Sequence, residues 1–299
     1  MTPRIAILAG DGIGPEVIEA ALPSLGDDAE IVRIDAGAER YLATGEVLGA
    51  DELARIRAAD ALLLGAVGDP RVAEGVLERG ILLRLRRELD LYVNLRPFPE
   101  IGVVVVRENT EGLYSGIGES SGDVATETSM NTASAIARCA RYAFELAARR
   151  SGRLTLVHKT NVLVHAGALW RRIVAELNAD WPSVTLGYEH ADAAAYHLVN
   201  NPQRFDVILT DNLFGDLLSD VAAGVAGGLG RAASANLHPE VGTRPSRCIG
   251  LFEPVHGSAP DIAGREAADA TAAKRAARML RRALDEQGAL YVAGPGGDN

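Results

Sequence analysis

The sequence predicts an α/β protein whose central sheet is largely parallel. Short apolar runs typical of buried strands alternate along the chain with amphipathic stretches that have helical spacing. This alternation is the pattern of βα units, in which neighbouring strands run parallel. A length of 299 residues favours about two domains, each with its own core.

The expected strands are apolar runs bounded by polar or glycine-rich turns. They are residues 4–9, 29–34, 61–66, 102–106, 154–157, 184–188 and 205–209. Residues 133–150 have one apolar face at helical spacing and predict a helix. Residues 112–128 are rich in Gly, Ser and Thr and predict a projecting hairpin or arm. The Gly- and Ala-rich residues 224–245 are a candidate crossing between domains.

Composition argues against several classes of protein. A net charge of −10 disfavours nucleic acid and anionic membranes as partners, since both require a basic face. No apolar stretch reaches transmembrane length, and residues 5–9 are too short for a signal peptide, so we expect a cytoplasmic protein. Cys139 and Cys248 have no paired spacing, which excludes a disulfide scaffold and a cysteine-based zinc site.

Polar turns follow several of the expected strands, at residues 10–14, 107–109, 158–161 and 210–212. Ligands of open α/β sheets bind beyond the carboxyl ends of the strands, so these turns predict a site there. Only two of the 30 basic residues are lysines, Lys159 and Lys274. Lysine can lose its proton where arginine cannot, which makes Lys159 in the third turn a candidate for proton transfer.

The turn Gly10–Gly14 has the spacing G-x-G-x-G. A Rossmann dinucleotide site requires G-x-G-x-x-G, so this segment by itself favours an ordinary strand-to-helix turn with Pro15 in the first helical turn.

Two aspartates four residues apart, Asp216 and Asp220, share one face of an expected helix. Their charges repel unless a hard cation such as Mg²⁺ or Mn²⁺ binds between them. A solvated helix face is the more frequent explanation of such a pair. A third acidic residue, Asp192, lies in an otherwise apolar stretch and favours the metal site.

Three arginines, Arg86, Arg96 and Arg107, flank or end apolar runs. The planar guanidinium matches a carboxylate, so the three together suit a di- or tricarboxylate ligand. The alternative is surface arginine, most of all for Arg86, which has arginine neighbours. The small residues of 256–261 allow a ligand to approach the backbone closely, although an ordinary loop has the same composition.

Taken together, these segments resemble one known family, the β-decarboxylating dehydrogenases of 3-isopropylmalate, isocitrate, homoisocitrate and tartrate. The matching motifs occur in family order and span almost nine-tenths of the chain. They are GDGIGPEV (10–17), LDLYVNLRP (89–97), VVRENTEGLYSG (105–116), HKTNV (158–162), FDVILTDNLFGDLLSD (205–220) and FEPVHGSAPDIAG (252–264).

The resemblance implies a fold of two α/β domains, distinct from a Rossmann fold, and a role for each motif residue. Residues 1–97 and 235–299 would form the cofactor domain, and 98–234 the metal-binding and dimer-forming domain. Arg86, Arg96 and Arg107 would hold the substrate carboxylates, and Asp192, Asp216 and Asp220 would bind Mg²⁺ or Mn²⁺.

The resemblance also assigns the proton transfers. Lys159, with Asp192 nearby, would assist removal of the hydroxyl proton, and Tyr114 would protonate the enolate left after decarboxylation. Lys159 and Asp192 would come from a second subunit, which implies a homodimer whose contact includes the arm 112–128.

Cofactor choice follows from the last motif. Asp261 would accept hydrogen bonds from an adenosine ribose and repel a 2′-phosphate, which predicts NAD rather than NADP. The implied cofactor residues are Ile13, Glu253, His256, Gly257, Ser258, Ala259, Asp261 and Ile262.

Leu82 and Leu83, which precede Arg86, suit an isopropyl group and would desolvate a third carboxylate without compensation. They favour the NAD-dependent oxidative decarboxylation of 3-isopropylmalate to 4-methyl-2-oxopentanoate and CO₂, a step of leucine biosynthesis. The motif at 107–114 is closer to the branches acting on isocitrate, homoisocitrate and tartrate, which remain alternatives. A catalytically silent regulatory subunit is a further alternative, although the presence of Tyr114, Lys159 and the three aspartates counts against it.

Overall fold

The computed structural model describes residues 2–240, 244–265, 267–286 and 290–292. The chain divides into two compact units. The first comprises Met1–Leu91 and Gly228–Leu290, and the second Tyr92–Gly227 and Tyr291–Asn299. The α/β fold with mostly parallel strands confirms the fold class predicted from the alternation of apolar and amphipathic segments.

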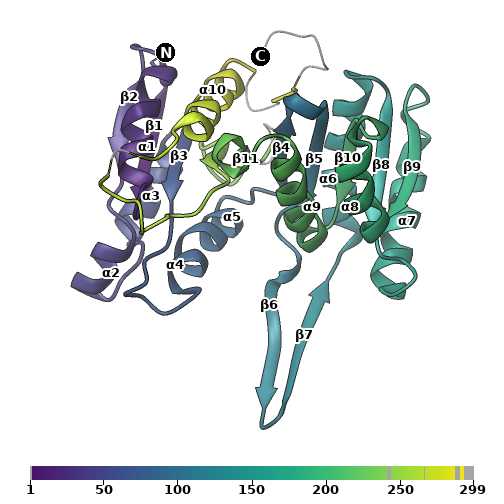
Figure 1. Cartoon of the computed structure of the whole chain (residues 1–299), viewed down its shortest axis with the longest axis horizontal. Helices are drawn as coiled ribbons and strands as arrows, with labels where there is room; N and C mark the ends of the chain where they lie inside the picture. The colour runs from purple at the N-terminus through teal and green to yellow at the C-terminus, as the bar shows by residue number, and fades with distance from the viewer. Residues whose placement is uncertain (1, 241–243, 266, 287–289, 293–299) are drawn as a thin grey trace. The chain divides into compact units, whose positions relative to one another are not determined.

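In the first unit the strands lie in the order β2-β1-β3-β12-β11 (Figure 1). Their bounds are β1 Arg4–Gly10, β2 Glu30–Arg33, β3 Ala61–Ala66, β11 Ala233–Leu237 and β12 Gly250–Pro254. Strand β1 pairs in parallel with β2 and β3, and only β11 runs antiparallel to its neighbour β12. The side chains of β3 are all buried, as expected of a strand covered on both faces.

The helices of the first unit follow the apolar periodicity of the sequence. They are α1 Gly14–Ala21, α2 Ala38–Thr44, α3 Ala50–Ala58, α4 Val76–Glu78, α5 Arg84–Glu88 and α10 Thr271–Asp285, with a π-helical turn η2 at Arg79–Leu83. Helix α1 has Pro15 in its first turn, as the sequence predicts. The buried face of α10 is almost entirely alanine, which lets its backbone approach the sheet closely.

In the second unit the strands lie in the order β4-β5-β10-β8-β9 (Figure 1). Their bounds are β4 Val93–Phe98, β5 Val103–Glu108, β8 Arg153–His158, β9 Thr185–His190 and β10 Val207–Thr210. Strands β5, β10, β8 and β9 are parallel, and β4 runs antiparallel to β5. The carboxyl ends of β5, β8 and β10 therefore open at the same edge, where the sequence has its polar turns.

The second unit's helices are α6 Ala133–Ala148, α7 Val164–Asn178, α8 Ala191–Asn200 and α9 Asn212–Val225. Helix α6 lies within the stretch for which the sequence predicts a helix, and Thr132 caps its first turn by accepting from the backbone N–H of Ala135. Short 3₁₀ turns occur in both units. They are η1 Leu22–Leu25, η3 Pro99–Ile101, η4 Pro202–Arg204 and η5 Leu229–Arg231.

The unit boundaries differ from those that the sequence suggests. The resemblance places residues 93–97 in the first domain, whereas the structure forms strand β4 there, in the second unit, where it pairs with β5 along its whole length. Tyr291 also belongs to the second unit: its ring stacks on Tyr142, and Arg149 lies over the same ring. The boundary at Gly227/Gly228 falls inside the Gly- and Ala-rich segment 224–245.

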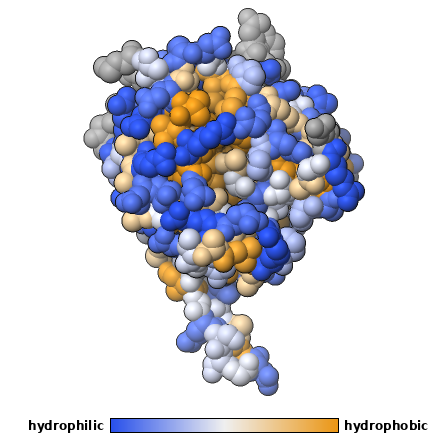
Figure 2. Space-filling view, turned by 90° about the vertical axis from the view of Figure 1, so that its left-hand side faces the viewer, coloured by the Kyte–Doolittle hydropathy of each residue, from blue (hydrophilic) through white to orange (hydrophobic). Residues whose placement is uncertain are grey.

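The segment 112–128 forms an antiparallel hairpin of β6 (Gly112–Ser121) and β7 (Val124–Met130). The hairpin extends away from the sheet of its unit (Figure 1), and its surface is mostly polar or of intermediate hydropathy (Figure 2). Most of its side chains are exposed, including Ile117 and Val124. Among the described residues, no helix is long and apolar enough to span a membrane.

Candidate active site

A cluster of charged side chains lies in the second unit, where β4, β5 and β6 meet helix α9. Arg96 from β4 donates from Nη2 to Oδ1 of Asp216 at 3.2 Å, and Arg107 from β5 donates from Nη1 to the same oxygen. The hydroxyl of Tyr114 on β6 donates to Oδ2 of Asp216 at 2.7 Å. Three residues that the sequence singled out therefore meet at the carboxylate of a fourth, Asp216.

Arg107 is almost completely buried and is held in one orientation. Its Nε and Nη2 both donate to Oδ1 of Asn212, at 2.9 and 2.7 Å. Its stem packs against Gly215, where an added Cβ would lie 2.5 Å from Cγ of Arg107. The guanidinium carbon lies 4.9 Å from the centre of the Tyr114 ring, within cation–π distance. Gly215 and Asn212 of α9 thus fix the orientation of the Arg107 guanidinium.

Arg96 is also buried and has different partners. Its Nε donates to Oδ1 of Asn94 at 2.8 Å, and Nη1 donates to Oγ of Ser219 at 2.7 Å. Nη1 also lies 3.6 Å from Oδ1 of Asp220. Two of the carboxylates expected to bind metal, Asp216 and Asp220, therefore lie beside this one guanidinium.

The aspartate pair is accessible. The side chain of Asp220 is 53% exposed and that of Asp216 is 34% exposed. Partial burial raises the pKa of Asp220, and the nearby Asp216 raises it further, although Arg96 opposes the shift. Two adjacent carboxylates that repel one another and keep contact with solvent suit a hard divalent cation.

Asp192 does not join this pair. It lies at the start of α8 and accepts a hydrogen bond at 2.5 Å from Nζ of Lys159, which follows β8. This hydrogen bond lowers the pKa of Asp192. Within the described part of the chain, no three His, Cys, Asp or Glu side chains gather as a metal-binding group. The single chain thus presents two separate acidic sites: Asp216 with Asp220, and Asp192 with Lys159.

Helix α9 begins at a buried acid that the sequence marked only as part of a polar turn. Oδ1 of Asp211 accepts from the backbone N–H of Phe214 at 2.8 Å and so caps the helix that carries Asp216 and Asp220. Burial raises the pKa of Asp211 to about 6. His158 lies with Nε2 3.6 Å from Oδ2 of Asp211, and burial lowers the pKa of this histidine to about 4.

Arg86 belongs to the first unit and is buried there. Its Nε donates to Oδ1 of Asn236 at 3.1 Å, and its Nη2 lies 3.7 Å from Oε1 of Glu253. Leu82 and Leu83, on the π-helical turn η2, are partly buried, and Leu82 packs against the core of this unit.

Two of the expected cofactor residues, Ile13 and Ser258, meet at the β1–α1 turn. The backbone N–H of Ile13 donates to the carbonyl of Ser258 at 2.8 Å, and a Cβ on Gly12 would lie 2.0 Å from that oxygen. Gly12 is therefore required for the two segments to touch. The Nε2 atom of His256 is buried without a hydrogen-bond partner, whereas Asp261 is exposed.

Four hydrogen-bond partners of the arginines were not singled out individually by sequence reasoning: Asn94, Ser219, Asn212 and Asn236. Asn94 is a fully buried amide within an apolar strand, and such a residue signals a specific partner because a buried amide must be hydrogen-bonded. Asn212 lies in one of the polar turns that follow the expected strands.

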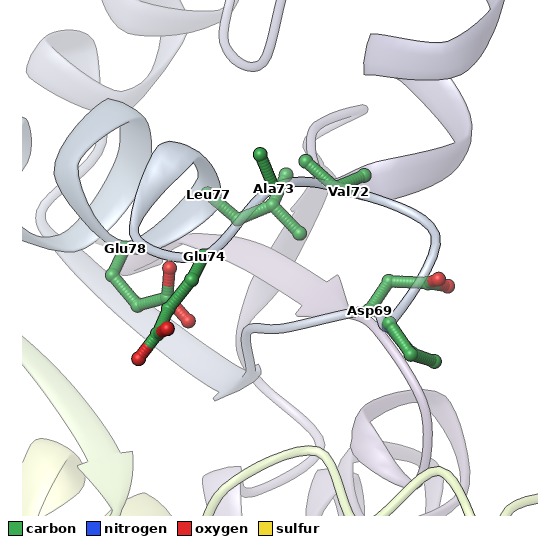
Figure 3. A pocket seen from close by; sticks show the side chains of 7 residues that line it. Asp69, Val72, Ala73, Glu74, Leu77 and Glu78 are labelled. Carbon is green, nitrogen blue, oxygen red and sulfur yellow. The ribbon is translucent and has the colours of Figure 1, made fainter.

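The first unit also contains a cavity of about 490 Å³ that the sequence did not suggest (Figure 3). Its lining is partly acidic. The lining residues are Asp69, Pro70, Val72, Ala73, Glu74, Leu77 and Glu78. Gly68 lies between this cavity and the turn that contains Ser258, since a Cβ added there would lie 3.6 Å from Oε1 of Glu78 and 3.2 Å from Oγ of Ser258.

Known proteins resemble this chain over nearly its whole length. The 3-isopropylmalate dehydrogenase of Nocardia farcinica is 52% identical over 304 residues, which cover 95% of this chain and 89% of that protein. The 3-isopropylmalate dehydrogenase of Corynebacterium glutamicum strain R is 51% identical over 312 residues, covering 97% of this chain and 90% of that protein.

Solved structures of related dehydrogenases have the same fold as this chain. Isocitrate dehydrogenase from Methylococcus capsulatus superposes with a TM-score of 0.86 at 36% identity, over 96% of this chain and 87% of that one. A β-decarboxylating dehydrogenase from Thermococcus kodakarensis, in its apo form, superposes with a TM-score of 0.78 at 36% identity, over 99% of this chain and 92% of that one. The model of the isocitrate/isopropylmalate dehydrogenase family matches residues 4–290. The chain belongs to the isocitrate/isopropylmalate dehydrogenase family.

Proposed function

We propose that this protein oxidatively decarboxylates 3-isopropylmalate with NAD, forming 4-methyl-2-oxopentanoate, CO₂ and NADH in leucine biosynthesis. The observation that carries this proposal is the meeting of Arg96, Arg107 and Tyr114 at the carboxylate of Asp216. The relatives named 3-isopropylmalate dehydrogenase, at 51–52% identity, support the choice of substrate.

Arg96 and Arg107 bind the carboxylates of the substrate in this proposal. Both guanidiniums are held by neutral side-chain acceptors and already contact a carboxylate, that of Asp216. A carboxylate presented by the substrate meets the same planar donors. Arg86 is proposed as a further carboxylate ligand.

The residues present fit a divalent cation, because Asp216 and Asp220 offer adjacent, partly exposed carboxylate oxygens. Asp216 and Asp220 would hold Mg²⁺ or Mn²⁺, with Asp192 of a second copy as the third ligand. The ion would stabilise negative charge on the substrate oxygen during decarboxylation.

Two groups of the chain move protons. Lys159, oriented by Asp192, assists removal of the hydroxyl proton as the hydride passes from the hydroxyl-bearing carbon to NAD. After CO₂ departs, Tyr114 donates its phenol proton to the enolate carbon of the product. The Tyr114 hydroxyl already acts as a hydrogen-bond donor in the cluster, toward Asp216.

The first unit offers the features that suit NAD. The close contact of Gly12 with the Ser258 carbonyl brings the turn before α1 and the turn at 256–261 together, so that both border one site. His256 is half-buried, and its Nε2 atom, which has no hydrogen-bond partner among the described residues, suits a polar ligand group. The exposed Asp261 can accept hydrogen bonds from ribose hydroxyls. The remaining proposed contacts are Ile13, Glu253, Gly257, Ala259 and Ile262.

The partly buried Leu82 and Leu83 favour an apolar substituent on the malate carbon. An isopropyl group packs against leucine, whereas a third carboxylate would lose hydration there without a compensating partner. This preference separates 3-isopropylmalate from isocitrate, homoisocitrate and tartrate, which share the malate part.

We further propose that the protein acts as a cytoplasmic homodimer with sites shared between the copies. Large apolar side chains are exposed in five parts of the second unit: the hairpin, the turn after Lys159, and helices α7, α8 and α9. They are Leu113, Ile117, Val124, Met130, Val162, Leu163, Val164, Tyr196, Val199 and Leu217. Contact with a second copy would remove this surface from water.

Turnover tests the proposal. The purified protein with Mn²⁺ is mixed with a panel of malate derivatives and either NAD or NADP, and reduced cofactor is followed by absorbance. We expect the highest kcat/KM with 3-isopropylmalate and NAD. Preferential turnover of isocitrate would identify the protein as an isocitrate-type enzyme instead. If neither NAD nor NADP is reduced, the result would favour a silent regulatory subunit.

A further inference from the structure

We propose that Tyr188 is the positioning residue that sets the geometry of the Lys159–Asp192 pair. This inference rests on the proposed role of that pair in proton transfer. Tyr188 lies on β9. Among the described residues, its contacts involve neither the carboxylate cluster around Asp216 nor the Lys159 amine. Its hydroxyl instead joins the two backbone segments that carry Lys159 and Asp192.

The hydroxyl of Tyr188 has polar neighbours on both segments. It donates to the backbone carbonyl of His158 at 3.0 Å and accepts from the backbone N–H of Thr160 at 3.3 Å. It also lies 2.9 Å from Oγ1 of Thr160 and 2.9 Å from Nδ1 of His190. Residues on either side of Lys159 and the residue that precedes α8 are thus tied to one oxygen.

The topology explains why one side chain reaches both places. Strands β8 and β9 are parallel neighbours, with His158 opposite His190 in register. Lys159 is the first residue after β8, and Asp192 lies two residues after the last residue of β9. The two strand ends therefore present the lysine and the aspartate side by side, and Tyr188 lies just before the edge.

The hydrogen-bonding capacity of a phenol makes the arrangement directional. A phenol offers one donor and two acceptor positions. The His158 carbonyl can only accept and the Thr160 N–H can only donate, so these two contacts orient the hydroxyl. One acceptor position remains, facing Thr160 Oγ1 and His190 Nδ1. Phenylalanine would keep the ring and lose every one of these contacts.

Packing against α7 also restrains the turn that contains Thr160. Gly167 of α7 touches Thr160 so closely that an added Cβ would lie 2.7 Å from Cα of Thr160. The guanidinium carbon of Arg171, on the same helix, lies 5.2 Å from the centre of the Tyr188 ring. The ring is held by this contact whether or not the hydroxyl is present, so removal of the hydroxyl tests the hydrogen bonds alone.

The test compares Tyr188→Phe with the wild-type protein in two measurements. In turnover of 3-isopropylmalate with NAD and Mn²⁺, we expect kcat to fall about tenfold, which corresponds to the loss of one or two net hydrogen bonds, while both KM values stay within about twofold. A variant that merely loosens the fold would lower the melting temperature and change KM as well.

The second measurement needs no turnover. Trace acetylation with acetic anhydride, read by mass spectrometry, compares Lys159 with the exposed Lys274, the only other lysine of the chain. We expect the ratio of Lys159 to Lys274 labelling to rise about threefold in Tyr188→Phe, because the Lys159 amine is held less firmly against Asp192. An unchanged ratio overturns the proposal, whatever the activity.

Two further variants keep the result decisive. Thr160→Val removes the hydroxyl at the other end of the 2.9 Å contact with little change of shape, and should raise the labelling ratio in the same direction even if Tyr188→Phe folds poorly. Tyr41→Phe, in α2 of the first unit, is the matched control and should leave ratio and kcat unchanged. A wild-type protein that is inactive toward 3-isopropylmalate would refute the proposed function. The ratio of Lys159 to Lys274 labelling would still test whether Tyr188 positions Lys159.

Discussion

Arg107 donates to the carboxylate of Asp216 and, through its two other donor positions, to the side chain of Asn212, which lies one turn earlier on the same helix. One guanidinium thus connects the end of β5 with two positions of α9. The arrangement uses the fixed fork of arginine, because the donors point along different directions of one plane.

Arg107→Lys keeps the positive charge and loses the fork. A single ammonium cannot reach both Asn212 and the carboxylate, so we expect kcat/KM for 3-isopropylmalate to fall about 100-fold, the size of effect expected from a misplaced binding group. Steady-state kinetics measures the change. Arg149→Lys on the exposed end of α6 is the control and should behave as wild type. Equal activity of the two variants would show that the fork of Arg107 is dispensable.

Gly215→Ala should be destabilising because its Cβ would lie 2.5 Å from Cγ of the buried Arg107. We expect the free energy of unfolding to fall by about 1–3 kcal/mol, as for other overpacked sites. Gly224 lies on the same helix, and a Cβ added there would have no neighbour within 4 Å, so Gly224→Ala should stabilise by about 0.5–1 kcal/mol. Urea unfolding of both variants measures the difference, and equal effects of the two substitutions would contradict the packing argument.

The burial of Asp211 and of His158 predicts an unusual dependence of stability on pH. The pKa of Asp211 is raised to about 6, so its contribution is present below its ordinary value of 3.8 and is lost as the pH rises through 6. The pKa of His158 is lowered to about 4, so its contribution is present above 6.5 and is lost as the pH falls through 4. The two slopes have opposite signs between about pH 4 and 6 and largely cancel.

Asp211→Asn separates these two contributions, since asparagine caps a helix as well as aspartate does and does not titrate. We expect the variant to lose stability on acidification from about pH 6.5 to 4 more steeply than wild type, and to exceed wild type above about pH 6 by about 1–3 kcal/mol. Urea midpoints measured across this range give both slopes. Parallel curves for the two proteins would show that Asp211 does not titrate in this window.

A site shared between two copies can be tested by complementation. Lys159→Ala and Asp220→Asn should each be inactive alone. In a mixed dimer, one site combines the intact Asp220 of one copy with the intact Lys159 of the other. Co-expression or joint refolding should therefore restore about one quarter of wild-type activity, since half of the dimers are mixed and each has one complete site. No recovery in verified mixed dimers would show that Lys159 and Asp220 act within the same copy.

Most strands could be predicted because they are continuous apolar runs, as in β3 and β5. Strands β4, β11 and β12 are absent from the expected set. β4 contains Asn94 and Arg96, and β11 contains Ser234 and Asn236, so neither reads as an apolar run. These strands bury polar side chains that pair with arginines: Asn94 with Arg96, and Asn236 with Arg86. Such pairing is a tertiary property, which the periodicity of the chain does not reveal.

The sequence by itself determined the local elements and the chemical types of the site, since the strand and helix periods and the motifs are properties of neighbouring residues. The tertiary structure decided which of these groups meet. Arg107 and Asp216 are 109 positions apart, and Arg96 and Asp216 are 120 apart, so no local pattern joins them. Only the pairing of β4 with β5, and the packing of α9 beside them, brings two guanidiniums to one carboxylate, while Asp192 is placed with Lys159 at another strand end because β8 and β9 are neighbours.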